Sequence, residues 1–76
     1  LDVFRTPVPS GLAGRTLADS RIRERTGCTV VALAAGSDHF EPPRADAVLA
    51  AGADLLLIGD DRSEARFFET FHDHPR

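Results

Sequence analysis

The sequence has no methionine and no lysine, and its only cysteine is Cys28. A complete translation product begins with methionine, and a residue left first after methionine removal is usually small. We therefore expect a chain that starts at Leu1 to be a piece of a longer polypeptide. One cysteine excludes an internal disulfide and fits a reducing compartment. The absence of lysine excludes a phosphate loop of the Walker type, which needs that side chain after its glycines.

Long apolar runs and a strong charge excess are also missing. No apolar segment approaches the length of a membrane span, and there is no signal-like segment. The net charge of −3 argues against nucleic acid as the main partner. A chain of 76 residues with 42% apolar residues forms one small domain at most. Its core is modest, and a partner subunit would add stability.

The first half of the chain predicts a strand, a helix and a second strand. Residues 2–9 mix β-branched residues with prolines, which is typical of an edge strand that runs into a turn. Thr16 and Asp19 have the spacing of a capping box at the start of a helix, and Gly27 is a natural end for it. The apolar run 28–34 predicts a central strand that is covered on both faces.

The second half predicts two further strands and a terminal helix. Residues 39–41 form a short strand, and after an irregular segment that ends at Gly52, residues 54–59 form a strongly apolar strand. The last helix is capped by Asp61 or Ser63. The fold class is therefore α+β, a β-α-β-β-β-α domain with a mostly antiparallel sheet and helices on one face. Residues 2–71 form its core and 72–76 a tail.

Three phenylalanines lie within the predicted terminal helix. Phe67 and Phe71 are four residues apart, and Phe68 and Phe71 are three apart, so they share one stripe of the helix. In a domain of this size such a stripe fills the core, or it leaves area for docking another chain.

The stretch "RIRERTGCTVVAL", residues 21–33, raises the question of a ligand. On a continuous helix Arg21 and Arg25 share a face, and we expect both to point toward water. Arg23 points roughly the other way, near the place where the helix meets the sheet, and a ligand or interface role stays open for it.

No catalytic or metal-binding pattern is present in the sequence. Cys28 has no histidine or second cysteine at metal-ligand spacing, so we expect it to be structural. His72 and His74 form an H-x-H that we interpret as part of the tail, and Asp60-Asp61 as turn and cap chemistry. No nucleophile is flanked by a base and an orienting group, so we do not expect an enzyme or a metal centre.

The ordered set of these motifs resembles the TrkA C-terminal domain, the C-terminal lobe of the regulator-of-conductance-of-potassium (RCK) module. The matching pieces are Val8-Pro9, the segment Leu12-Ala13-Gly14-Arg15-Thr16-Leu17, the helix end from Arg23 to Gly27, the strand 29–33, and Leu49-Ala50-Ala51-Gly52 followed by the strand 55–59. The resemblance spans residues 2–71.

The resemblance implies a regulatory function. Such domains lie at the cytoplasmic end of potassium channels, potassium uptake systems and cation/proton antiporters, usually behind a Rossmann-type nucleotide-binding lobe. They pair as homodimers, and some bind cyclic di-AMP at the dimer cleft. The implied ligand-binding residues here are Arg21, Ile22, Arg23, Cys28, Thr29, Pro42 and Pro43, with Arg23 reaching a phosphate.

The resemblance leaves two functions open. One is an effector-sensing, dimerising domain of a potassium channel or uptake protein, which needs no resident cofactor and gates transport when it binds a small ligand. The other is a ligand-free module that only couples the subunits of an antiporter or another transporter. A fragment of a hydrolase or transferase is disfavoured by the missing nucleophile–base pair.

Overall fold

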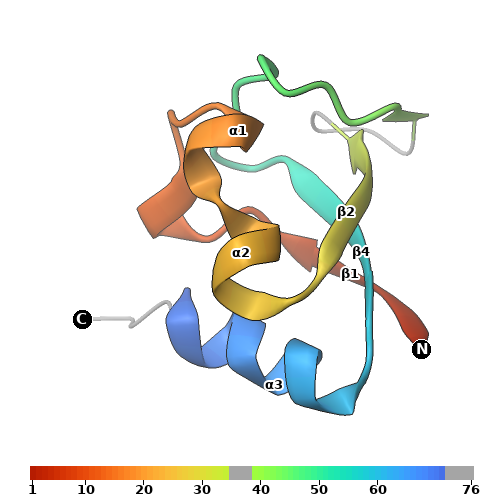
Figure 1. The fold of residues 1–76 in the computed structure, drawn as a ribbon. Coiled ribbons are helices and arrows are strands. Elements are labelled where there is room, and N and C mark those ends of the chain that lie inside the picture. Colours follow the sequence, from red (N-terminus) through yellow and green to blue (C-terminus); the bar gives the residue numbers. More distant parts are fainter. Residues whose placement is uncertain (35–38, 72–76) are drawn as a thin grey trace.

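The computed structural model describes residues 1–34 and 39–71, which form a four-stranded sheet with helices beside it (Figure 1). The elements in chain order are β1 (Asp2–Pro7), the 3-10 helix η1 (Ser10–Leu12), α1 (Leu17–Ser20), α2 (Ile22–Thr26), β2 (Thr29–Ala34), β3 (Phe40–Glu41), β4 (Asp54–Gly59) and α3 (Asp61–Thr70). This order confirms the predicted α+β class. The tail residues 72–76, with both of their histidines, lie outside the described residues, as does the predicted turn at 35–38.

The sheet has the strand order β1-β4-β2-β3, and every pair in it is antiparallel. β4 is the central strand: Leu55 and Leu57 point into the core and are fully buried, whereas Leu56 and Ile58 point to the other face and are half-buried. The alternation is that of a sheet with one covered face. The core is completed by Leu12, Ile22, Cys28, Leu49, Phe67 and Phe71.

The strand β2 is an inner strand of the sheet, between β4 and β3, as predicted, but the prediction that it is covered on both faces is wrong. Thr29 is exposed and Val31 is 39% exposed. A register shift between Val30 and Ala32 leaves Val31 without a partner on β4. β3 pairs only with Leu33 and Ala34, so no described strand covers the outer edge of β2 before them. The apolar run reflects one buried face and one open face.

The prediction of a continuous helix after Thr16 is also wrong. Thr16 caps the helix as expected, because its Oγ1 accepts a hydrogen bond from the Asp19 N–H at 3.2 Å. Arg21, however, has φ 50° and ψ 38°, the left-handed conformation, and it separates α1 from α2. The Ser20 hydroxyl donates to the Leu17 carbonyl at 2.6 Å. In a continuous helix the N–H of residue 21 would donate to this same carbonyl.

Gly27 ends α2 as predicted, and two features require a glycine there. Its φ is 86°, and its N–H donates to the Arg23 carbonyl at 2.9 Å. A Cβ atom at this position would lie 2.8 Å from the Ser63 Oγ of α3. The positive φ therefore favours glycine here, and a Cβ would also require the Ser63 hydroxyl to move.

The terminal helix α3 is capped by Asp60, not by Asp61 or Ser63 as expected. The Asp60 Oδ1 accepts a hydrogen bond from the Ser63 N–H at 2.8 Å, so the helix starts earlier than either alternative cap requires. Phe67 and Phe71 are buried, while Phe68 is 46% exposed, so the phenylalanine stripe lies mostly in the core. No helix in the described segments is long and apolar enough to cross a bilayer.

Candidate ligand-binding site

Four of the seven candidate residues line one cavity of about 390 Å³. Ile22 and Pro43 contribute apolar surface, and Arg21 and Arg23 contribute guanidinium groups. The remaining lining residues are Leu17, Ala18, Ser20, Glu24, Val30 and Ala45. We refer to this space as the α1–α2 cavity, because residues of both short helices form its wall.

Backbone hydrogen bonds hold the opposite wall in place. The Leu17 N–H donates to the Ala47 carbonyl at 2.8 Å, and the Ala18 N–H donates to the Ala45 carbonyl at 3.0 Å. These bonds satisfy N–H groups in the first turn of α1, which have no partner within the helix. They also bring Pro43 and Ala45 against a helix more than twenty residues earlier in the chain, a proximity that no local sequence pattern shows.

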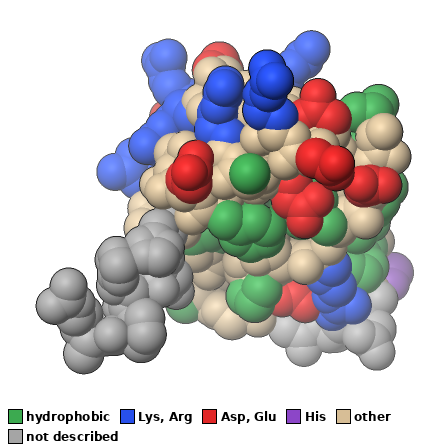
Figure 2. All heavy atoms as spheres, turned by 90° about the horizontal axis from the view of Figure 1, so that it is seen from below, with side chains coloured by type: hydrophobic (Ala, Val, Ile, Leu, Met, Phe, Trp, Pro, Cys, Tyr) green, Lys and Arg blue, Asp and Glu red, His purple; other side chains and the backbone are tan. Residues whose placement is uncertain are grey.

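The cavity carries more positive than negative charge. Arg21 and Arg23 outnumber Glu24, and neither arginine has an ion-pair partner within residues 1–34 and 39–71. Figure 2, which views the molecule from below, shows most of the visible arginine side chains (blue) along one edge and another on the opposite side, with acidic and hydrophobic side chains mixed between them. Planar guanidinium groups that lack a protein partner suit a phosphate or carboxylate ligand.

The predicted division of the three arginines holds only in part. Arg21 and Arg25 are exposed, as expected, but Arg21 lies at the cavity with Arg23 because the helix is interrupted at residue 21. The Arg25 guanidinium lies 4.7 Å from the centre of the Phe71 ring. Arg25 therefore packs on α3 by a cation–π contact.

The other three candidate residues do not line the α1–α2 cavity. Cys28 is fully buried in the core between α2 and the sheet, and this burial raises the pKa of its thiol. Its side chain therefore does not face the α1–α2 cavity. Thr29 pairs with Ile58 and so points to the open face of the sheet. Pro42 lines a different cavity.

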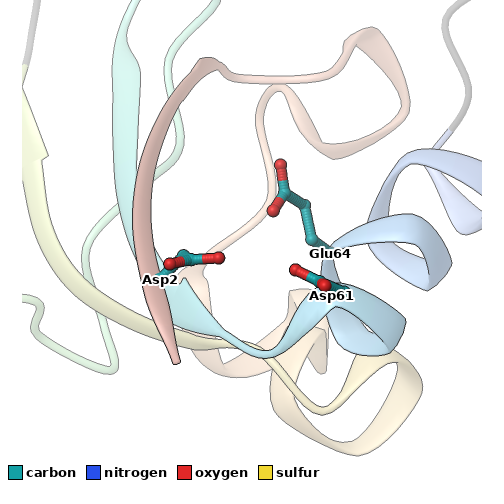
Figure 3. Close-up of side chains that lie close together, drawn as sticks. All are labelled: Asp2, Asp61 and Glu64. Carbon is teal, nitrogen blue, oxygen red and sulfur yellow. The ribbon is translucent and has the colours of Figure 1, made fainter.

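A group of three carboxylates lies at the start of α3. One oxygen from each of Asp2, Asp61 and Glu64 lies within 4.8 Å of the other two (Figure 3). Asp2 reaches the group because it pairs with Gly59 at the end of β4, a proximity that no local sequence pattern indicates. Acidic side chains in a first helical turn are stabilised by the helix dipole without any ion, and we assign none to this group. The adjacent N-cap hydrogen bond from Ser63 lowers the pKa of Asp60.

Comparison with known proteins shows the family. The TrkA-C domain model matches residues 3–72. The chain is similar to the GsuK channel at 41% identity and a TM-score of 0.82, covering 92% of this chain and 13% of that chain. No curated protein matches the chain.

Two smaller structures are similar along most of their own length. One is the RCK C domain of the potassium transport protein KtrA in complex with cyclic di-AMP, with 26% identity, a TM-score of 0.81, and 91% of this chain and 81% of that chain covered. The other is the RCK_C domain dimer of S. agalactiae BusR in complex with c-di-AMP, with 24% identity, a TM-score of 0.79, and 93% and 96% covered; at that identity it supports the fold alone. Matched by the family model over nearly its whole length, the chain belongs to the TrkA-C domain family.

Proposed function

We propose that this chain is the effector-sensing, dimerising regulatory domain of a potassium channel or potassium uptake protein, and that it acts at the cytoplasmic face of the membrane. The observation that carries the proposal is the α1–α2 cavity. It gathers Arg21, Ile22, Arg23 and Pro43, four of the seven candidate ligand-binding residues. The KtrA domain, whose structure contains cyclic di-AMP, supports the same ligand class.

The chemistry of the cavity suits one half of a symmetric, doubly negative ligand. Arg23 would bind a phosphate through its planar guanidinium, and Arg21 would add a second positive charge. Ile22 and Pro43 offer apolar surface against which a base can pack. Two copies related by a two-fold axis would present two Arg23 side chains to the two phosphates.

Gating follows only if the ligand distinguishes two arrangements of the dimer. A ligand that contacts both subunits favours the arrangement in which both sets of contacts form. The shift in the gating equilibrium is limited by the difference in affinity between the arrangements. Through a Rossmann-type lobe in the parent protein, this shift would reach the membrane pore or transport subunit. We expect neither a nucleic-acid partner nor catalysis.

A thermal-shift assay with a ligand panel tests the sensing function. The panel contains cyclic di-AMP, AMP, ATP, Mg²⁺ and Ca²⁺, each at millimolar concentration. A ligand present at a hundred times its Kd stabilises the folded form by about 2.7 kcal/mol, which a melting curve detects readily. We expect cyclic di-AMP to raise the Tm more than AMP does, since AMP supplies only one phosphate.

Light scattering tests the dimer separately. If the protein is a dimer and no ligand of the panel changes its Tm, the result supports the alternative function, a ligand-free module that couples the subunits of an antiporter or other transporter. A monomer at high protein concentration, with and without cyclic di-AMP, contradicts the shared-cleft arrangement.

A further inference from the structure

A second cavity, of about 180 Å³, lies beside the segment 41–54, and it shares no lining residue with the α1–α2 cavity. Leu33, Leu49 and Ala53 form an apolar part of its wall, and Leu49 and Ala53 are buried core residues. Three charged residues, Glu41, Arg44 and Asp54, also line it. We call it the 41–54 cavity.

The wall of this cavity is held in place although most of it has no helix or strand. The Gly14 N–H donates to the Leu49 carbonyl at 2.7 Å, and the Leu49 N–H donates to the Arg15 carbonyl at 2.8 Å. The Val8 N–H donates to the Ala53 carbonyl at 2.9 Å. A ligand would therefore enter a largely preformed space rather than order a loose loop.

The charges around the cavity leave one carboxylate in excess. Asp54 is neutralised by Arg5, whose Nη2 lies 2.6 Å from its Oδ2, and Arg44 lies 3.5 Å from an oxygen of Asp46. Glu41 has no hydrogen-bond or ion-pair partner in the described part of the chain. Its side chain lies on the same face of the sheet as Leu33, with which it pairs across β2 and β3. The apolar space is thus lined by one carboxylate without an ion pair among the described residues, Glu41, and by Arg44, whose pair with Asp46 is largely exposed to water.

From this arrangement we propose that the 41–54 cavity binds a small organic cation, an ammonium group attached to a compact apolar body. The apolar body would occupy the space beside Leu33, Leu49 and Ala53, and the ammonium group would lie at Glu41. An engineered apolar cavity of about 150 Å³ holds one benzene molecule, so a six-carbon body matches the size of this one. Such a ligand differs in charge from the anion expected in the α1–α2 cavity, and the site is independent of the proposed cyclic dinucleotide function.

Chemical-shift titration of the 76-residue chain with three isosteric probes tests the proposal. The probes are benzylammonium, benzyl alcohol and benzoate, each added up to its solubility limit. We expect benzylammonium to shift the amide resonances of Leu33, Leu49 and Ala53 and to bind about threefold more tightly than benzyl alcohol, the gain of one exposed ion pair. Added salt should reduce that difference. Benzoate should bind most weakly.

Two variants and one control give the assay its specificity. Glu41→Gln should remove the preference for benzylammonium over benzyl alcohol, and Ala47→Leu should abolish binding of both by filling the cavity. Arg23→Ala, at the other cavity, should change neither. If Ala47→Leu fails to fold, the Glu41→Gln result still decides the question. Glu41 is exposed, and glutamine has nearly the same size, so this variant should fold. The proposal is overturned if no probe binds, if benzoate binds as tightly as benzylammonium, or if Glu41→Gln leaves the preference intact.

Discussion

Replacing Arg21 by glycine should stabilise the domain relative to Arg21→Ala, opposite to the usual order within a helix. Arg21 is the only described residue other than glycine with a positive φ, at 50°. An L-residue in the left-handed region costs about 1–2 kcal/mol that glycine avoids. The larger entropy of the unfolded chain with glycine lowers this advantage by about 0.4–1 kcal/mol. The net advantage of glycine over alanine at this position is therefore roughly 0.5–1 kcal/mol.

Arg25 is the matched control for this experiment. It lies inside α2, is exposed, and belongs to the same arginine-rich stretch. There glycine should be less stable than alanine by about 1 kcal/mol. Both replacements lose the contact with Phe71 equally, so their difference isolates the backbone.

Thermal unfolding followed by circular dichroism gives the readout. For a domain of this size about 1 kcal/mol corresponds to a change in Tm of about 4–8 °C. The Tm should rise from Arg21→Ala to Arg21→Gly and fall from Arg25→Ala to Arg25→Gly. If glycine lowers the Tm at both positions, the helix runs straight through residue 21, and the two-helix wall of the α1–α2 cavity does not exist.

Three further predictions concern the cap, the core and the thiol. Asp60→Ala should lower the Tm at neutral pH by removing the N-cap of α3, whereas Asp60→Asn should keep most of the stability. The pKa of Asp60 is lowered in the folded state, so its ionised form stabilises the fold above the ordinary aspartate pKa near 4. This stabilisation is lost as the pH falls through the lowered pKa. The asparagine variant should lack that part of the acid sensitivity. Phe67→Ala should cost about 3–5 kcal/mol, and Phe68→Ala about 1 kcal/mol or less, in urea unfolding; equal losses would contradict the placement of the two rings. Cys28 should react with a thiol reagent only as fast as the domain opens, since its thiol is buried and its pKa raised; rapid labelling of the folded protein would place it elsewhere.

The parts of the fold that were predictable have local causes. The Thr16 cap and the Gly27 end follow from side-chain and backbone preferences within one turn. The strands follow from apolar runs bounded by glycine and proline, although their exposure does not. The run 29–34 has the composition of a fully buried strand, yet one face stays open because no described element packs on it. Composition alone does not distinguish these cases.

The site was predictable only where the family pattern names single residues. Ile22, Arg23 and Pro43 line one cavity, and their contact with a ligand stays a prediction. The place of Arg21 depends on a helix break at its left-handed backbone, beside the Ser20 side-chain hydrogen bond, and helical periodicity does not show this break. The 41–54 cavity depends on which backbone groups of that irregular segment bond to Val8, Gly14 and Arg15, and such long-range pairing leaves no periodic signal.

Isothermal titration of cyclic di-AMP into the wild-type domain and into Arg23→Ala tests the central claim most directly. Hydrogen bonds to charged groups contribute about 1.5–3 kcal/mol each, so the loss of one phosphate contact per subunit should weaken binding at least tenfold. Arg25→Ala, which removes a neighbouring arginine that packs on Phe71 away from the cavity, should leave the affinity within about twofold of the wild type. Wild-type affinity in Arg23→Ala, or an equal loss in Arg25→Ala, would contradict the assignment of the α1–α2 cavity as the effector site.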